Sequence, residues 1–143
     1  MNKGKIIALV AIVAAVTAFV VWSRGGPDTP TAGASSGRGP AVQVAIPAAF
    51  SDTAKIGERA FNATCAACHG ENAAGTEVGP PLVHRIYEPS HHADYAFDMA
   101  VANGVRAHHW KFGNMPPQPE VTKADVATIV TYVRELQRAN GID

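Results

Sequence analysis

The chain has 143 residues, which leaves room for one modest domain and an additional segment. Its formal net charge is zero, with 12 Lys and Arg against 12 Asp and Glu, so the overall charge does not favour nucleic-acid binding. Only two cysteines occur, and this number excludes a disulfide-rich scaffold.

The first predicted element is an uncharged apolar run from Ile6 to Trp22, preceded by Lys3 and Lys5. A helix of this length would span about 25 Å, slightly less than the hydrocarbon core of a bilayer. The lysines favour a cytoplasmic N-terminus. We therefore predict a membrane anchor over residues 1–22, with a single transmembrane helix at about 6–22. It would lie in the bacterial cytoplasmic (inner) membrane, with the C-terminal domain in the periplasm.

A cleaved signal peptide is the alternative, because Ala32-Gly33-Ala34 has the small-residue pattern of a cleavage site. The tripeptide lies well beyond the apolar run, so an uncut anchor is the preferred interpretation. Residues 23–50 are rich in Gly, Pro, Ala, Ser and Thr, and they are predicted to form a flexible linker. Apolar and polar residues alternate at residues 42–46, so a short strand is an alternative there.

The folded domain is predicted over residues 51–143, where 8 Lys and Arg against 11 Asp and Glu give a net charge of −3. Ser51 is a suitable cap for a first helix over about 52–65. Gly57 in this helix would permit the close approach of another backbone. A second helix is expected at about residues 91–103.

The last helix is predicted to begin at a capping box, Thr122-Lys123-Ala124-Asp125, and to run to about Ala139. Apolar residues repeat in it at helical spacing and indicate a buried face. This face consists of Val126, Ile129, Val130, Val133 and Leu136. Arg134, Glu135 and Arg138 lie off this face and are expected to point towards water.

The chain contains Cys65-Ala66-Ala67-Cys68-His69 at the end of the first predicted helix. Positions i, i+3 and i+4 share one face of a helical turn. Two thiols can therefore add to the vinyl groups of one haem while the imidazole binds its iron, and the motif predicts one covalent haem c. A redox dithiol is an alternative, although no strand precedes the motif. A zinc site is another, with two further ligands from His84, His91 or His92.

Met115 is the preferred candidate for the second iron ligand, because a thioether suits low-spin iron opposite imidazole. The prolines that follow it stiffen its loop. Met99 is the other methionine of the predicted domain, and it lies on the face of a predicted helix, where packing is its expected role. A bis-imidazole site or an open iron position remains an alternative, and the imidazoles available are His84, His91, His92, His108 and His109.

Other residues are candidates for the haem pocket. A carbonyl in Gly79-Pro80-Pro81-Leu82 can fix the second nitrogen of a metal-bound histidine. Trp110 and Phe112 are expected to shield the distal side of the haem. The pairs His91-His92 and His108-His109 suggest a second metal ion, such as copper or zinc, or proton uptake coupled to electron transfer, as alternatives to ordinary loop histidines.

From about residue 52 to 139, the sequence resembles class I monohaem cytochromes c. The similarity rests on Gly57-x-x-x-Phe61, Cys65-x-x-Cys68-His69, Gly79-Pro80-x-Leu82, Asn114-Met115-Pro116-Pro117 and Thr131-Tyr132-Val133-x-x-Leu136. The resemblance implies an all-α fold of three to four helices around one haem.

The resemblance also implies residue roles. His69 would be the proximal ligand and Met115 the distal ligand of the iron. The carbonyl of Pro80 would accept a hydrogen bond from His69, and Leu82 would form a wall of the haem pocket. The Gly57 and Phe61 side of the first helix would cross the last helix at Ile129 and Tyr132.

The expected function is that of a membrane-tethered electron carrier rather than an enzyme. Its donor would be a quinol-oxidising complex and its acceptor a terminal oxidase or reductase, with no nucleic-acid partner. One alternative is a haem c subunit of a larger exported oxidoreductase. Another is a ligand sensor or peroxidase-like enzyme with an open iron position.

Overall fold

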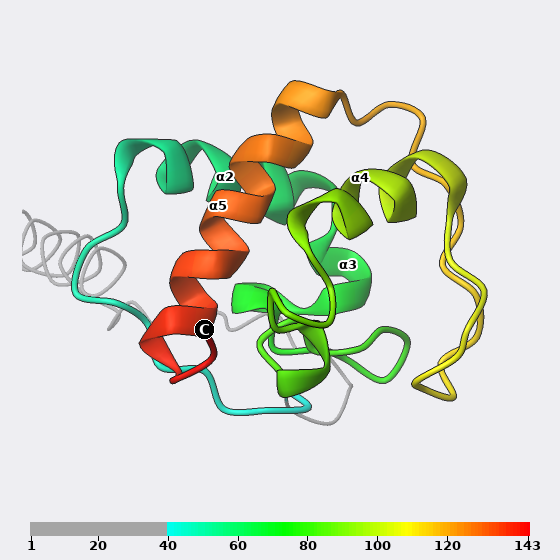
Figure 1. Cartoon of the computed structure of the whole chain (residues 1–143), viewed down its shortest axis with the longest axis horizontal. Helices are drawn as coiled ribbons and strands as arrows, with labels where there is room; N and C mark the ends of the chain where they lie inside the picture. Colours follow the sequence, from blue (N-terminus) through cyan, green and yellow to red (C-terminus); the bar gives the residue numbers. More distant parts are fainter. Residues whose placement is uncertain (1–39) are drawn as a thin grey trace, which may run out of the picture. The chain divides into compact units, whose positions relative to one another are not determined.

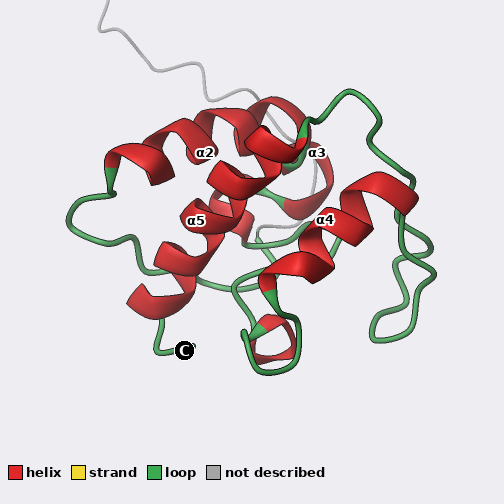
Figure 2. Cartoon of the chain, turned by 45° about the horizontal axis from the view of Figure 1, so that its top comes forward, coloured by secondary structure: helices red, strands yellow, loops and turns green. Residues whose placement is uncertain are grey.

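The computed structural model describes residues 40–143, where regular structure is helical apart from one isolated β-bridge. The elements are α2 (Asp52–Thr64), α3 (Ala66–His69), the 3₁₀ helices η1 (Glu71–Ala73) and η2 (Arg85–Tyr87), α4 (Asp94–Asn103) and α5 (Lys123–Ala139). Helix α5 contacts both α2 and α4, and α2 leads directly into α3 (Figures 1 and 2). The prediction of an all-α fold is therefore confirmed for the described residues.

The predicted anchor, residues 1–22, lies outside the described part of the chain, as does the linker up to residue 39. Among residues 40–143, no helix is long and apolar enough to cross a bilayer.

Residues 41–50 differ from the predicted flexible linker, because they are fastened to the folded domain. The N–H of Val42 donates to the carbonyl of Ala74 over 3.0 Å, and Ala45 exchanges hydrogen bonds of 2.8 and 2.9 Å with the Asn140 side chain. Val44 and Phe50 pack against the core. The bonding partners are a loop and a helix end rather than another strand, so no strand forms here.

Side-chain caps fix two of the helix starts as predicted. Ser51 Oγ accepts from the N–H of Ala54 over 3.1 Å at the start of α2. Thr122 and Asp125 form the reciprocal capping box of α5. The predicted start of α4 was three residues too early, because the N–H groups of residues 91 and 92 bond to the carbonyl of Glu88 in a turn.

The crossing of α2 and α5 forms the centre of the core. A Cβ on Gly57 would lie 1.9 Å from the carbonyl oxygen of Thr128, so only glycine permits this separation of the two backbones. One turn later, the rings of Phe61 and Tyr132 are 5.6 Å apart, and both side chains are fully buried. The predicted packing of these helices is confirmed.

The prediction that Arg134 of α5 points towards water was wrong, because its side chain is buried. Its guanidinium donates to Asp94 Oδ1 over 2.8 Å, to the carbonyl of Tyr87 over 2.7 Å and to the carbonyl of His92. Arg138 is exposed, as expected. Arg134 therefore ties the turn between η2 and α4 to the last helix.

Candidate haem-binding site

The C-terminal end of α2 and the short helix α3 bring both cysteines and His69 onto one turn. The N–H groups of Cys68 and His69 both bond to the carbonyl of Cys65, over 3.1 and 2.9 Å. Neither cysteine forms a disulfide, and the side chains of Cys65 and His69 line the same cavity. The local helical geometry expected from the spacing is therefore present.

A loop carbonyl orients His69. Its Nδ1 lies 2.9 Å from the carbonyl oxygen of Pro80, and a carbonyl can only accept, so Nδ1 carries the proton. Burial lowers the pKa of His69, and the hydrogen bond to Pro80 partly opposes this. A neutral imidazole with a bare Nε2 is the form that binds metals.

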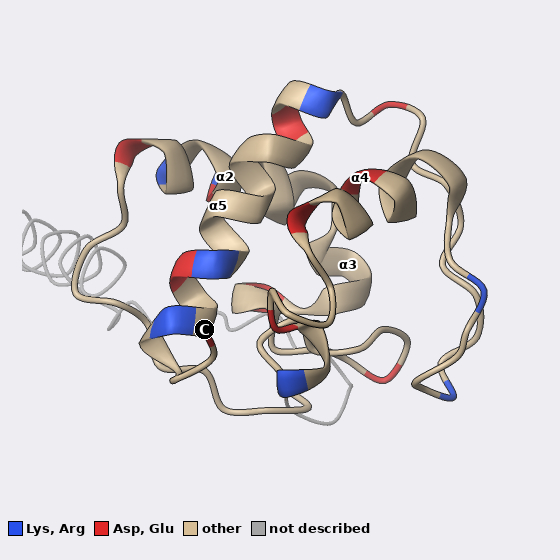
Figure 3. Cartoon of the chain, viewed as in Figure 1, with Lys and Arg blue, Asp and Glu red and all other residues tan. Residues whose placement is uncertain are grey.

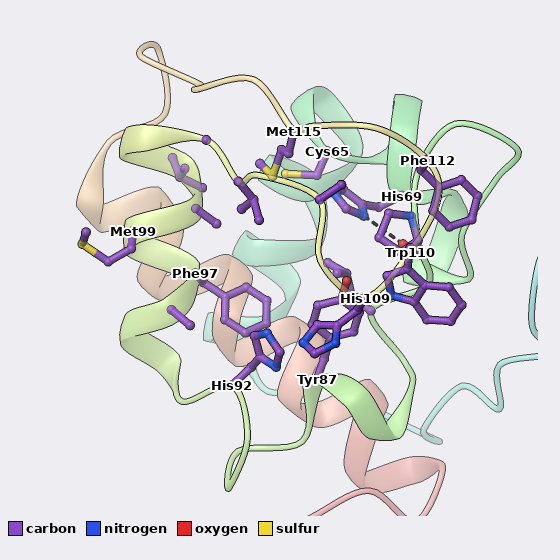
Figure 4. Close-up of a pocket in the computed structure, with 18 of the residues that line it drawn as sticks. Cys65, His69, Tyr87, His92, Phe97, Met99, His109, Trp110, Phe112 and Met115 are labelled. Carbon is purple, nitrogen blue, oxygen red and sulfur yellow. Dashed lines mark hydrogen bonds between the residues drawn. The ribbon is translucent and has the colours of Figure 1, made fainter.

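The cavity beside this turn has a volume of about 500 Å³, within the range of small-molecule and cofactor pockets. Its described walls contain no Asp, Glu, Lys or Arg. The predicted pocket residues Pro80, Leu82, Trp110 and Phe112 all line it, and Figure 4 shows Trp110 and Phe112 there. Their contact with the haem itself stays a prediction.

Several walls were not predicted, because they come from the packing of α4 and α5. Ala96 and Ala100 are small residues four apart on α4, a spacing that could have identified a face open to a flat ligand. Val126 and Ile129 of α5 were assigned to the core alone, but they also face the cavity.

The two candidate methionines lie differently. Met115 lines the cavity, and its backbone exchanges hydrogen bonds of 2.9 and 3.0 Å with Val105 in the isolated bridge. Gly104 permits this arrangement, since a Cβ there would lie 2.5 Å from the Met115 carbonyl oxygen. Met99 also borders the cavity, but it is 43% exposed, and Figure 4 shows its side chain pointing away from the other labelled residues.

The remaining alternatives for the cysteines do not fit this geometry. Burial, with a smaller contribution from Cys68, raises the pKa of Cys65 to about 11, whereas redox-active dithiols need a stabilised thiolate. Among the described residues, the one group with metal-ligand spacing consists of histidines and excludes both cysteines. A zinc site built on the CxxC pair is therefore not supported.

The polar end of the cavity also fits a haem. Trp110 Nε1 is buried without a hydrogen-bond partner among the described residues. The Tyr87 hydroxyl lies near this indole, and burial raises the pKa of Tyr87 while the proximity of Trp110 opposes the shift. Tyr87 and Trp110 both line the otherwise apolar cavity, and their two donors would suit the propionates of a bound haem.

The described histidines occupy distinct places. His84 Nδ1 accepts from the N–H of Ile86 over 3.2 Å, and its ring contacts Trp110 edge-on. The pairs at residues 91–92 and 108–109 meet at one edge of the cavity. The sequence shows the two histidine pairs, but it does not establish that they lie close together in the fold.

Comparison with known proteins agrees with this geometry. The family model for cytochrome c matches residues 54–137, more than half of the chain. The protein therefore belongs to the cytochrome c family, and it binds haem c covalently through the CxxCH motif of Cys65, Cys68 and His69. Searches of curated proteins and of solved structures gave no match.

Proposed function

We propose that this protein is a membrane-tethered monohaem cytochrome that carries single electrons between respiratory partners on the periplasmic side. In this proposal, His69 is the proximal and Met115 the distal ligand of the iron. One observation carries it: both side chains line a single uncharged cavity. The His69 ring is also held by its hydrogen bond to the Pro80 carbonyl, and the Met115 backbone is held by its two hydrogen bonds to Val105.

Two fixed axial ligands suit electron transfer for a physical reason. When the protein fills both axial positions, no iron site is left for a substrate, and the coordination does not change with oxidation state. Imidazole and thioether together favour a low-spin iron with a raised reduction potential. The Met115 loop is closed by its bridge to Val105. In this proposal the bridge persists in both oxidation states, so that little rearrangement accompanies electron transfer.

The proposed partners are a quinol-oxidising complex as donor and a terminal oxidase or reductase as acceptor. Acidic and basic residues are interspersed along the described chain (Figure 3), and the domain has a small net negative charge. A surface of this kind suits small, transient contacts at an exposed haem edge. The proposed tether is the apolar run at residues 6–22, which would keep the carrier near both partners.

Carbon monoxide tests the proposed ligation. The full chain is produced in a cell that attaches haem c to exported proteins and is purified in mild detergent. We expect the reduced protein to have a low-spin spectrum that carbon monoxide leaves unchanged, and its redox titration to follow a one-electron curve. Carbon monoxide binding by most of the protein would contradict the carrier and favour a ligand sensor or a peroxidase-like enzyme.

Fractionation of the same cells tests the tether and the partners. We expect the protein to stay in membranes after alkaline extraction, with an intact mass that includes residues 1–34. Release of a chain cut near Ala34 would contradict the anchor. Co-purification with stoichiometric catalytic subunits would contradict a freely diffusing carrier and favour a haem subunit of a larger oxidoreductase.

A further inference from the structure

Two histidine pairs from different loops meet at the edge of the haem cavity. His91 and His92 lie in the turn before α4, and His108 and His109 lie in the loop at residues 105–115. The rings of His92 and His109 are 5.2 Å apart, and Figure 4 shows them close together at the edge of the cavity. The proposed iron ligation uses none of these four residues.

Three of these side chains have the spacing of metal ligands. The available ligand nitrogens of His91, His92 and His109 all lie within 4.8 Å of one another. The Nε2 atoms of His91 and His109 are 3.4 Å apart. Two nitrogens on a tetrahedral zinc ion, each at about 2.0–2.1 Å from the metal, are separated by about 3.4 Å. The pair therefore has the separation that a shared ion requires.

Hydrogen bonds outside the cluster orient its members. His92 Nδ1 lies 2.6 Å from the carbonyl oxygen of Ile86, so Nδ1 donates and the Nε2 lone pair remains available. Metal-binding histidines in proteins are held by such a contact. The carbonyl of His92 also accepts from the buried guanidinium of Arg134, which fixes the backbone of this turn.

The opposing loop is also fixed, and the cluster is open to an ion. The N–H of Ala107 donates to Asn114 Oδ1 over 3.0 Å, and the Val105–Met115 bridge closes the loop behind it. His91 and His109 are exposed, so a hydrated ion can reach them. These contacts position His109 opposite the turn before the ion arrives.

The surroundings of His92 favour its neutral imidazole. Burial lowers the pKa of His92, and the charges of His91, His108 and Arg134 lower it further, while the hydrogen bond to Ile86 partly opposes this. Crowded imidazoles repel one another when protonated, whereas a cation that accepts their lone pairs removes that repulsion.

We propose that His91, His92 and His109 form a second metal site, which binds one divalent transition-metal ion at the edge of the haem cavity. Imidazole ligands suit Cu²⁺, Zn²⁺ and Ni²⁺, and Cu²⁺ is expected to bind most tightly. Three protein ligands leave a further position for water. The bound ion would join the loop that carries Met115 to the turn that Arg134 holds.

The test uses the haem-loaded full chain, purified without a polyhistidine tag and treated with a chelator. Zn²⁺ is the main probe because it does not exchange electrons with the haem. Equilibrium dialysis with metal analysis is expected to give one Zn²⁺ per protein. Cu²⁺ is expected to give an electron paramagnetic resonance spectrum with hyperfine splitting from several nitrogens. Excess Zn²⁺ should also raise the thermal unfolding midpoint.

Substitutions assign the site. His91→Gln removes an exposed ligand that does not line the haem cavity, and it is expected to weaken Zn²⁺ binding about 10–100-fold. The same variant should lose the rise in unfolding midpoint and keep the haem spectrum of the wild type. His84→Gln is the matched control, because His84 is neither a proposed ligand nor part of the CxxCH motif and, unlike His108, has no ring contact with the three ligands.

The results of these experiments distinguish a failure of the second metal site from a failure of the proposed electron-carrier function. Failure of the wild type to bind Zn²⁺ or Cu²⁺ would overturn the second site and leave the haem ligation untouched. Equal loss of binding in His84→Gln and in His91→Gln would also overturn it, since binding would then be non-specific. A changed haem spectrum in His91→Gln would assign this histidine to the haem instead and contradict the second site.

Discussion

The imidazole of His69 donates its Nδ1 proton to the main-chain carbonyl of Pro80 over 2.9 Å. This contact fixes the tautomer of the proposed proximal ligand and strengthens its Nε2 as a donor. The loop can approach the CxxCH turn because residue 79 is glycine. A Cβ there would lie 2.4 Å from the carbonyl oxygen of Cys68. Gly79 therefore controls the orientation of His69 from outside the cavity.

Gly79→Ala is expected to push this loop away and weaken the His69–Pro80 hydrogen bond. Overpacking of this kind costs about 1–3 kcal/mol of stability. The reduction potential should rise, because a less polarised imidazole stabilises oxidised iron less well. Thermal unfolding and a redox titration measure the two effects. Val78→Ala, at an exposed neighbour, is the control. A destabilised variant with an unchanged potential would argue against the electronic effect.

Met115→Ala is expected to abolish the weak sulfur-to-iron charge-transfer band of the oxidised protein. The reduction potential should fall and the iron should become high-spin, because the soft sixth ligand is lost. Met99→Ala is the matched control and should keep the band, since Met99 borders the cavity but is 43% exposed, and its side chain points away from Met115 (Figure 4). Retention of the band in Met115→Ala would show that Met115 is not the ligand.

Gly57→Ala tests the crossing of α2 and α5. Helix propensity alone would make alanine more stable than glycine by about 1 kcal/mol. The structure predicts the opposite sign, a loss of about 1–3 kcal/mol, because the new Cβ would overlap the carbonyl of Thr128. Chemical unfolding of the haem-loaded protein measures the difference. A stabilised variant would mean that the helices are farther apart than described.

Arg134→Met is expected to destabilise the domain by about 2–4 kcal/mol, because buried charge-assisted hydrogen bonds to main-chain carbonyls are lost. Arg138→Met, one turn away and exposed, should change stability by no more than about 0.5 kcal/mol. The comparison uses unfolding midpoints of both haem-loaded variants. Equal effects at the two positions would place Arg134 at the surface.

The capping box of α5 predicts a pH dependence. Hydrogen bonds from the side chain and then the backbone of Thr122 hold the pKa of Asp125 below its ordinary value of 3.8. This carboxylate therefore contributes stability above pH 3.8, and the contribution is lost as the pH falls through the lower, folded-state pKa. Asp125→Asn should be less stable than the wild type at neutral pH, with the difference vanishing in acid. Unfolding measured across pH checks this, and a constant difference would contradict it.

The sequence predicted features that depend on local spacing. The three residues of the CxxCH motif share one helical turn, and the caps at Ser51 and Thr122 involve partners within three residues. Gly57 also indicated the helix crossing, because a glycine on an otherwise apolar helix face permits the close approach of a second backbone.

Features that depend on distant partners could not be predicted. Arg134 lies off the apolar face of α5, and the acceptors at Tyr87, His92 and Asp94, some 40 residues away in the sequence, allow it to be buried. Residues 41–50 have the composition of a linker, but Asn140 at the far end of the chain holds them. The histidine pairs meet because two loops converge, and their spacing in the sequence does not reveal this.

The most direct test of the account is the fate of the haem when the purified, exported protein is extracted with acidified acetone. Thioether bonds to Cys65 and Cys68 survive this treatment, whereas a haem held by ligation alone dissolves. We predict that the colour stays with the polypeptide and that its mass exceeds that of the bare chain by one haem. Loss of all colour to the solvent, with the mass of the bare chain, would contradict the account.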